Sequence, residues 1–277
     1  MMARTLANRV PAPPACVVLY SPRDRARAMV RAAFPRRHGR IVTVRTAGEC
    51  SDVFRSMLVD AAVVDISAPG EETWRIAELA REFPSAPFFG LSPLRAGDGP
   101  AVGRCVSLDF ADVLVEGVDD PVARALIAPH AFSARFAESL RDPPPTLALS
   151  TDIQLRTWRW VVAFPGRALR TDALAKAVGV TREHLSRSFA AFGAPNLKRV
   201  IDLVRLVAAA ELSKNPGYDT RDVARVLGFA SSSHLSSTAQ RVVGTKPVSL
   251  ARLRTVDLVE RFVRGRGRTR AQDRSES

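Results

Sequence analysis

Short apolar runs alternate with amphipathic stretches through the first half of the chain. Each stretch that follows a run repeats its apolar residues at the helical period. Strands that alternate with helices predict a parallel sheet covered on both faces, because each crossover lays a helix across the sheet. We therefore expect a parallel α/β domain over residues 15–129, behind a flexible lead at residues 1–14. Its five expected strands are Cys16–Tyr20, Ile41–Arg45, Ala61–Ile66, Pro87–Leu91 and Val113–Val115.

The second half has helical periodicity, and between Thr171 and Val248 it repeats itself. A repeat of roughly fifty residues indicates one structural unit used twice. Each copy has an apolar helix, a glycine and then a second amphipathic helix, which is the order of a helix-turn-helix. The first copy contains Leu174, Ala175, Val178, Gly179, His184, Leu185 and Ser186, and the second contains Val223, Ala224, Leu227, Gly228, His234, Leu235 and Ser236.

Glycine and threonine residues locate the expected helix ends. Gly179 and Gly228 are suited to the positive φ of a turn, and Thr171, Thr181 and Thr220 are suited to cap the helices that follow. The expected buried stripes are Leu185, Phe189 and Phe192 in the first copy and Leu235, Ala239, Val242 and Val243 in the second.

The outward faces of the second helices are polar and cationic, which is the chemistry that reads base edges in a major groove. They carry Arg182, Glu183, Ser186 and Arg187 in the first copy and Ser232, Ser233, Ser236, Ser237, Gln240 and Arg241 in the second. Between the copies, the expected helix at residues 197–213 is apolar on more than one side, so it should be buried on both flanks. It would then hold the two copies at a fixed separation, and both recognition helices could enter successive major-groove segments.

Residues 153–250 resemble the DNA-binding domain of the AraC/XylS family of transcriptional regulators. The resemblance is carried by Gly228-Phe229, by Gly244 and Pro247, and by the Arg205-Leu206-x-x-Ala209 spacing of the linking helix. It implies base contacts from Glu183, Ser186, Arg187, Ser232, Ser233, Ser236 and Ser237, with Arg182 and Arg241 beside them.

Three departures from that family pattern bear on recognition. The chain is one residue shorter between Phe189 and Gly193, Ser237 stands where the family commonly has arginine, and Ala239 stands where it has phenylalanine. A serine hydroxyl cannot make the two-pronged guanine contact of an arginine. We therefore expect the first copy to discriminate between sequences and the second mostly to position the protein.

The charge distribution agrees with nucleic-acid binding by the second half. Residues 1–145 hold 18 Lys and Arg against 17 Asp and Glu, whereas residues 146–277 hold 23 against 11. The net charges are therefore +1 and +12, out of +13 for the chain. Phosphate binding requires such an excess. An arginine-rich composition alone is the alternative, but arginine is balanced by acids in only one half.

The run Asp60–Gly70 places Asp65 near the end of the third expected strand, and Ser92 follows the fourth. With these residues, the segment 15–129 resembles the receiver domains of two-component response regulators. The resemblance implies a flavodoxin-like fold, with Asp65 at the phosphoacceptor position and Ser92 where receivers keep Ser or Thr. Receivers have an acidic pair for Mg²⁺ after the first strand, where this chain has Ser21 and Pro22, and a lysine after the fifth, where it has Glu116. Phosphoryl transfer needs that ion and its carboxylate ligands. We expect a degenerate, non-catalytic receiver in which Glu116 adds repulsion and Asp24 opens a helix.

The remaining segments connect or extend these domains. We expect a helix at residues 130–142 with Phe132, Phe136 and Leu140 on its apolar stripe, then a stiff spacer at residues 143–145 that marks the domain boundary. Residues 130–150 are thus a connector, residues 151–263 the DNA-binding domain and residues 264–277 a disordered basic tail. A basic arm that touches DNA phosphates is the alternative for the tail.

The chemistry of an enzyme is missing from the sequence. The four histidines are scattered, and Cys16, Cys50 and Cys105 lack metal-ligand spacing, so we expect reduced buried thiols, no metal and no cofactor. No signal or membrane segment is visible, and we expect a cytoplasmic protein. The expected partners are double-stranded DNA, a second copy through the N-terminal domain and, as a further candidate, RNA polymerase. Alternative functions are a response regulator switched at Asp65 and an architectural protein that binds DNA without reading it.

Overall fold

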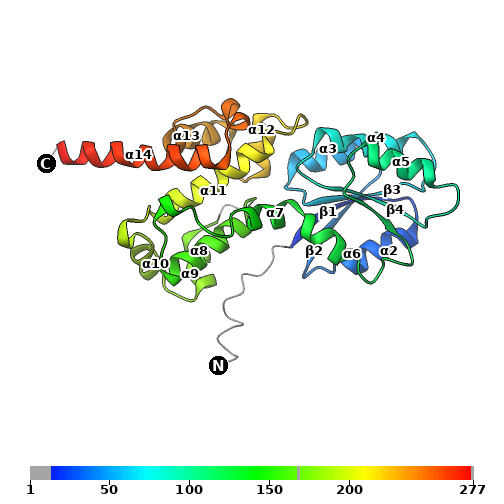
Figure 1. Cartoon of the computed structure of the whole chain (residues 1–277), viewed down its shortest axis with the longest axis horizontal. Coiled ribbons are helices and arrows are strands. Elements are labelled where there is room, and N and C mark those ends of the chain that lie inside the picture. Colours follow the sequence, from blue (N-terminus) through cyan, green and yellow to red (C-terminus); the bar gives the residue numbers. More distant parts are fainter. Residues whose placement is uncertain (1–13, 167–168, 276–277) are drawn as a thin grey trace, which may run out of the picture. The chain divides into compact units, whose positions relative to one another are not determined.

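The computed structural model describes residues 14–166 and 169–275. Over these residues the chain forms two compact units (Figure 1). The sheet unit holds residues 14–135 and 215–222, and the helical unit holds residues 136–166, 169–214 and 223–275. Most of the expected lead, residues 1–13, lies outside the described residues, as do residues 276 and 277.

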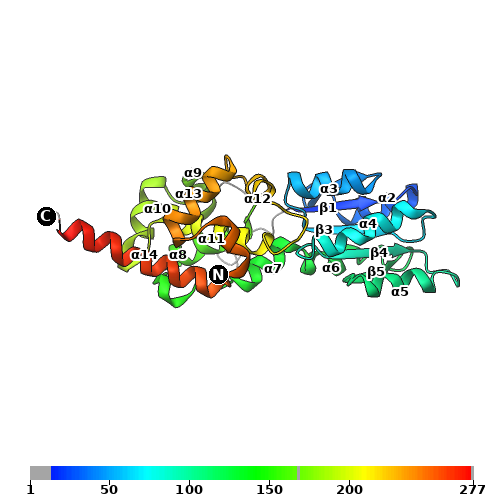
Figure 2. The same ribbon diagram turned by 90° about the horizontal axis from the view of Figure 1, so that it is seen from above.

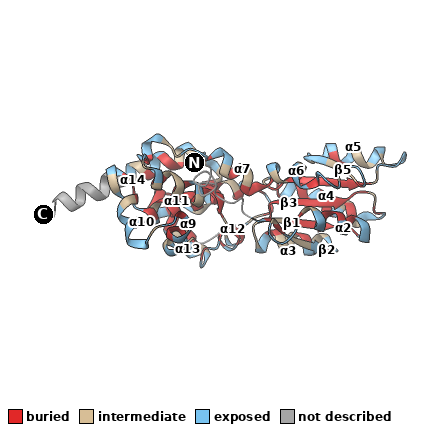
Figure 3. Ribbon diagram, turned by 90° about the horizontal axis from the view of Figure 1, so that it is seen from below, coloured by how far each residue is buried: buried red, intermediate tan, exposed pale blue. Residues whose placement is uncertain are grey.

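The sheet unit is a parallel sheet of five strands, as the alternation of apolar runs and helical stretches predicts (Figure 2). The spatial order is β2-β1-β3-β4-β5. The strands are β1 (Ala15–Tyr20), β2 (Gly39–Val44), β3 (Ala61–Asp65), β4 (Phe88–Ser92) and β5 (Asp112–Val115). Every residue of β3 and β4 is buried, because helices cover both faces of the sheet (Figure 3).

Two apolar cores flank this sheet. One contains side chains of α2 (Asp24–Ala33) and α6 (Ala123–Ile127), and the other contains side chains of α3 (Ala47–Ser56), α4 (Glu71–Glu82) and α5 (Gly99–Ser107). In the second core the ring of Phe54 stacks on Phe83 at 4.4 Å between centroids. Phe83 also meets Tyr218, from the segment 215–222, edge to face at 4.9 Å. This segment was expected within the DNA-binding domain.

The parallel register brings the carboxyl ends of the strands to one edge of the sheet. Tyr20 pairs with Val64, Asp65 with Leu91, and Ser92 with Val115. The loops that follow β1, β3, β4 and β5 therefore meet at this edge, and Asp65 lies among them.

The helical unit begins within α7 (Phe132–Ser139), because the division between the units falls after Arg135 and not at the expected spacer, residues 143–145. The side chains of the expected stripe of α7, Phe132, Phe136 and Leu140, are buried. Further along, Trp158 Nε1 donates to the Leu140 carbonyl at 2.7 Å, which ties the chain after α7 to the helical unit. The other helices are α8 (Asp152–Ala163), α9 (Thr171–Val178), α10 (Arg182–Phe189), α11 (Leu197–Leu212), α12 (Thr220–Val226), α13 (Ser232–Val243) and α14 (Thr255–Ser275), with 3-10 turns at η1 (Ala128–His130), η2 (Pro145–Leu147), η3 (Ala191–Gly193) and η4 (Pro247–Arg252).

The turns of both helix-turn-helix copies are formed at the expected glycines. Gly179 has φ 75° and Gly228 has φ 66°, which confirms the expected positive φ at both positions. Thr181 caps α10 by accepting a hydrogen bond from the backbone N–H of His184. Ser231 caps α13 in the same way, from the N–H of His234 at 3.0 Å.

The two other expected caps are wrong. Thr171 is the first residue of α9, and Arg170, which precedes it, makes no side-chain cap. Thr220 is the first residue of α12, and the carboxylate of Asp219 accepts from the N–H groups of Arg221 and Asp222 at 2.7 and 2.8 Å. In each case the helix begins at the threonine, so that a different residue precedes it.

Phe192 is a second correction, because it does not join the buried stripe of the first recognition helix. Helix α10 ends at Phe189, and Phe192 has φ 54° with 77% of its surface exposed. The helical period stops before it reaches Phe192, in the segment where the chain is one residue shorter than the family pattern.

The expected disordered tail is also different in the structure. Helix α14 continues to Ser275, through most of residues 264–277. Arg264 forms an ion pair with Glu260 at 3.0 Å, one turn earlier, which favours the helix at this point. Among the described residues, no helix is long and apolar enough to cross a membrane.

Candidate nucleic-acid interface and receiver-like site

The first recognition helix, α10, presents its polar residues to solvent. Leu185 and Phe189 are fully buried beneath it. The four predicted contact residues of this helix, Arg182, Glu183, Ser186 and Arg187, are all exposed. Arg182 is partly occupied by an ion pair, Nε to Asp172 Oδ1 at 3.4 Å, whereas the ion pairs of the described residues do not include Arg187. Arg187 is therefore the more available of the two cations on this face.

The second recognition helix, α13, uses its serine hydroxyls within the helix. Ser236 Oγ donates to the carbonyl of Ser232 at 3.0 Å, and Ser237 Oγ donates to the carbonyl of His234 at 3.1 Å. Ser233 and Ser237 are exposed, while Ser232 and Ser236 are half-buried. The hydroxyl protons of Ser236 and Ser237 are thus already engaged.

Helix α11 connects the two copies and is buried along most of its length. Leu197, Val200 and every residue from Ile201 to Ala210 are buried, which confirms the expected burial on both flanks. Arg205 lies in this run, stacks its guanidinium on the Phe229 ring at 3.8 Å and donates Nη2 to the Leu227 carbonyl at 3.0 Å. It fastens α11 to the turn of the second copy, a role that the Arg-Leu-x-x-Ala spacing did not reveal.

Arg241 lies near the end of α13 and is also anchored to α11. Its Nη2 donates to Asp202 Oδ2 at 2.8 Å, while 54% of the Arg241 side chain remains exposed. Arg241 therefore has N–H donors left for another partner, although one of its nitrogens is already paired with Asp202.

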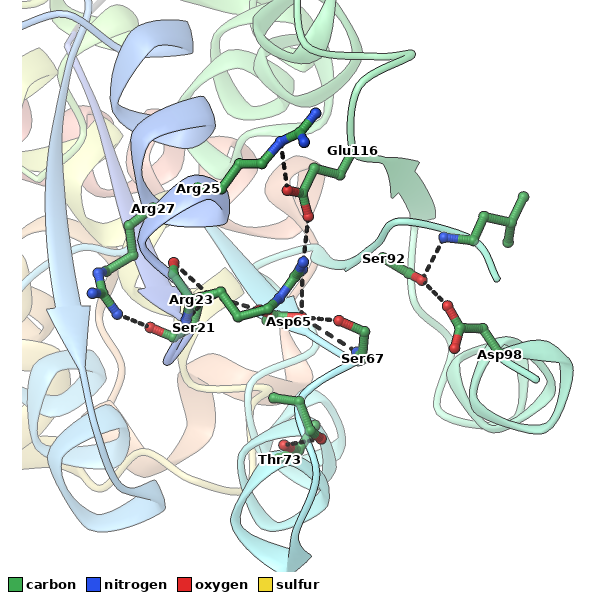
Figure 4. Close-up of polar contacts among 12 residues, drawn as sticks. Ser21, Arg23, Arg25, Arg27, Asp65, Ser67, Thr73, Ser92, Asp98 and Glu116 are labelled. Carbon is green, nitrogen blue, oxygen red and sulfur yellow. Dashed lines mark hydrogen bonds and ion pairs between the residues drawn. The ribbon is translucent and has the colours of Figure 1, made fainter. Parts of the chain in front are cut away.

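Asp65 lies at the carboxyl edge of the sheet and is fully buried (Figure 4). Both of its oxygens are occupied. Arg23 Nε and Nη2 donate to Oδ2 and Oδ1 at 2.7 and 2.9 Å. Ser21 Oγ donates to Oδ2 at 2.6 Å, and Ser67 Oγ donates to Oδ1 at 2.8 Å. A guanidinium thus lies against the carboxylate that receivers phosphorylate.

Glu116 shares the same guanidinium, which corrects the expectation that it adds uncompensated repulsion. Arg23 Nη1 donates to Glu116 Oε2 at 2.5 Å, and Arg25 Nε lies 3.1 Å from Oε1. The hydrogen bond with Asp65 and the charges of both carboxylates raise the pKa of Arg23. Sequence reasoning missed Arg23, although it lies in the loop that carries the acidic pair of receivers. Asp24, which was expected to open a helix, is the first residue of α2 and forms an ion pair with Arg27.

Ser92 is held away from Asp65 by its own loop. Its hydroxyl donates to Asp98 Oδ2 and accepts from the backbone N–H of Leu94 at 2.8 Å (Figure 4). Asp98 also accepts from the N–H of Arg95 at 3.0 Å, and the hydrogen bond from Ser92 is the main cause that lowers the Asp98 pKa. The hydroxyl that receivers turn toward the phosphoryl group is thus engaged elsewhere. In the described part of the chain, no three His, Cys, Asp or Glu residues are grouped to hold a metal ion.

Comparisons with known proteins support the helical assignment. A family model described as a helix-turn-helix domain matches residues 174–252. No curated protein matches the chain.

Three solved structures show weak overall similarity. Full-length FixJ from B. japonicum is 13% identical, with 82% of this chain and 96% of that chain covered and a TM-score of 0.37. A response regulator from Burkholderia pseudomallei is 14% identical, with coverages of 64% and 99% and a TM-score of 0.36. The RcsB response regulator of Salmonella typhimurium is 11% identical, with coverages of 68% and 97% and a TM-score of 0.33. At such scores these similarities add nothing to the description of the site.

The internal repeat, its two turn glycines and the matched residues point to the same conclusion. Residues 174–252 form a helix-turn-helix domain of the AraC type, which indicates a DNA-binding transcription regulator, and the five-stranded parallel sheet at its N-terminal side is the α/β fold expected of a receiver-like domain.

Proposed function

We propose that this regulator reads DNA by placing α10 and α13 in successive major-groove segments of one duplex face. The burial of α11 carries this proposal, because a connecting helix that is buried nearly all round can hold the two recognition helices in a fixed relation. The net charge of +12 on residues 146–277 supplies the phosphate attraction that any such complex needs.

The two recognition helices contribute unequally to specificity. Glu183, Ser186 and Arg187 on α10 are exposed, and Arg187 can make the bidentate guanine contact that favours one base over others. On α13 the hydroxyls of Ser236 and Ser237 are bonded to their own helix, and Arg241 is paired with Asp202. Ser232, Ser233 and Arg182 complete the contacts with the duplex. The first helix therefore discriminates, and the second mainly fixes position.

The receiver-like domain acts without phosphoryl chemistry in this proposal. Phosphorylation requires a carboxylate oxygen free to attack and a divalent ion that neutralises the phosphoryl group. At Asp65 both oxygens accept hydrogen bonds, and Arg23 supplies the positive charge from within the protein. The domain then modulates DNA binding through ligand binding or association.

A second copy of the chain is the proposed partner of the N-terminal domain. Val106 in α5 has 71% of its surface exposed, so its side chain is available to such an association. Sedimentation equilibrium should give the mass of a dimer, and Val106→Asp should shift it toward the monomer. RNA polymerase remains a candidate partner for activation.

Selection of bound sites from random duplex DNA tests the proposal most directly. We expect a consensus with two conserved segments about 10 base pairs apart, centre to centre, because two helices on one face must be separated by one turn of DNA. The segment bound by α10 should be the better conserved. Recovery of sequences without any consensus would contradict sequence-specific binding and favour an architectural protein.

A further inference from the structure

A cationic cleft of about 400 Å³ lies in the helical unit, between the two helix-turn-helix copies. We call it the central cleft; its lining includes the cations Arg170, Arg182, Lys198, Arg205 and Arg241 and the acids Asp172 and Asp202. Five cations against two acids give a net charge of +3 with His234 neutral. An adjoining hollow of about 340 Å³ shares Lys198 and Arg241 and adds Arg199.

The two acids do not satisfy all of these cations. Asp172 lies 3.4 Å from Arg182 and 3.9 Å from Arg170, and Asp202 is paired with Arg241 at 2.8 Å. Lys198 is exposed, and the hydrogen bonds and ion pairs of the described residues do not include it. The cleft therefore keeps at least one cationic side chain ready for an external anion.

Arg205 adds buried positive charge to the lining of the central cleft. Only 8% of its surface is exposed, and its Nε has no hydrogen-bond partner among the described residues. A buried donor without a partner is costly, particularly on a charged group. Burial, and then the nearby charge of Arg241, also lower the pKa of Arg199. Positive charge is thus crowded around the cleft beyond what its acids compensate.

We propose that the central cleft binds a phosphate of the DNA backbone, from the stretch between the two major-groove segments. This rests on the proposed function. Arg182 opens α10 and Arg241 lies near the end of α13, so the cleft lies between the recognition helices. A duplex that receives both helices must carry its backbone across this space. Lys198 and Arg241 donate to the phosphate, and Asp202 weakens the contact by repelling it and by holding Arg241.

Replacement of Lys198 tests the contact against a matched lysine. Lys198→Ala should reduce the slope of log Kd against log salt by about one, equivalent to about an eightfold loss of affinity at 0.1 M salt. The loss should be equal on the selected site and on a scrambled duplex, because a phosphate contact carries no sequence information. Lys214→Ala is the control: Lys214 follows the far end of α11, about 24 Å along the axis from Lys198, and is paired with Glu211. An unchanged slope for Lys198→Ala, or an equal change for Lys214→Ala, would overturn the proposal.

Asp202→Asn gives a test in the opposite direction. The variant keeps the shape of the side chain and removes its charge, so affinity for both duplexes should rise by the same factor, several-fold at 0.1 M salt. Circular dichroism should show an unchanged helix content. Weaker binding by a folded Asp202→Asn protein would mean that the carboxylate only organises Arg241 and that no phosphate approaches it.

Neutral methylphosphonates, placed one at a time along the selected site, locate the phosphate. A methylphosphonate at one or two linkages between the conserved segments should weaken binding by the wild-type protein. The same substitution should hardly weaken binding by Lys198→Ala, because this variant has already lost the contact. Full sensitivity of Lys198→Ala at those linkages would refute the assignment. If no site can be selected from random DNA, the proposed function is contradicted. If a site is selected but no linkage between its conserved segments is sensitive, only the cleft proposal is contradicted.

Inorganic phosphate separates DNA from a free anion as the occupant. At constant ionic strength, millimolar phosphate should leave the melting temperature of wild-type protein unchanged, because the cleft is open and the duplex holds the phosphate in place. Stabilisation of wild type but not of Lys198→Ala would indicate a site for a small anion instead.

Discussion

Arg23 donates two parallel hydrogen bonds to Asp65, from Nε to Oδ2 at 2.7 Å and from Nη2 to Oδ1 at 2.9 Å. Its remaining nitrogen, Nη1, donates to Glu116. The side chain of Asp65 is fully buried, and that of Arg23 is 29% exposed. One guanidinium therefore compensates two carboxylates at the edge of the sheet where receivers bind a divalent ion.

Removal of Arg23 should destabilise the sheet unit more than removal of either carboxylate. Arg23→Met leaves two buried acids without their shared cation, and loss of one partner of a buried pair costs about 3 kcal/mol of unfolding free energy. Glu116→Gln should cost about 1 kcal/mol, since Arg23 keeps Asp65. The control is Arg75→Met, which breaks the exposed pair with Glu71 and should change stability by less than about 0.5 kcal/mol. Urea unfolding measures all three, and equal effects at Arg23 and Arg75 would contradict the internal-cation interpretation.

Wild-type protein should remain unphosphorylated when it is incubated with acetyl phosphate and Mg²⁺. Asp65 has no free oxygen and Ser92 is bound to Asp98, so neither the nucleophile nor the hydroxyl partner is available. Intact-protein mass spectrometry detects the added phosphoryl group. A phosphoprotein that disappears in Asp65→Asn would identify a response regulator switched at this residue.

The fold could be predicted from the sequence because its signals are local and repeated. Five apolar runs gave the five strands, and the glycines at positions 179 and 228 gave both turns. Boundaries shifted where a cap decides them. Thr171 and Thr220 were expected as caps, but each is the first residue of its helix. Periodicity also failed at Phe192, because it assumes a helix that had already ended.

The receiver-like site was harder to predict because a long side chain reaches into it from a neighbouring position. Ser21 and Pro22 stand at the positions of the acidic pair of receivers, and neither side chain is a cation. The Arg23 guanidinium lies several bonds from its own backbone, so only the structure places it on Asp65 and Glu116. For the same reason, spacing identified Arg205 but not its stacking on Phe229.

The turn of the first helix-turn-helix should not tolerate a side chain at Gly179. Its φ of 75° lies in the left-handed region, while a Cβ there would meet no atom within 4 Å, so the cost is backbone strain alone. Gly179→Ala should lower the unfolding free energy by about 1 to 2 kcal/mol. Fluorescence of the buried Trp158 reports on this unit. Gly97→Ala, with equally open space and no left-handed φ, should change stability little; an equal loss in both variants would argue against strain.

The three thiols should react slowly in the folded protein. Burial raises the pKa of Cys50 to about 12 and those of Cys16 and Cys105 to about 11, so almost no thiolate exists at pH 8. An ordinary thiol has a pKa near 8.5. Labelling by iodoacetamide at pH 8 should therefore be at least about 100-fold slower in buffer than in urea, and the Cys16 and Cys105 rates should rise with pH up to about 11. Rapid labelling of one thiol at pH 8 would show that its surroundings open or are polar.

Replacement of Arg187 should reduce the preference for the selected site, whereas replacement of Ser237 should not. Arg187 is exposed on α10 and is not among the described ion pairs, while the Ser237 hydroxyl is bonded to the carbonyl of His234. Loss of a bidentate base contact removes about 1 to 3 kcal/mol of discrimination, or roughly 5- to 150-fold. Competition between the selected site and a scrambled duplex measures it, and Ser237→Ala should stay within about threefold of wild type. If Arg187→Ala weakened both duplexes equally, Arg187 would bind phosphate, and α10 would not read bases through this residue.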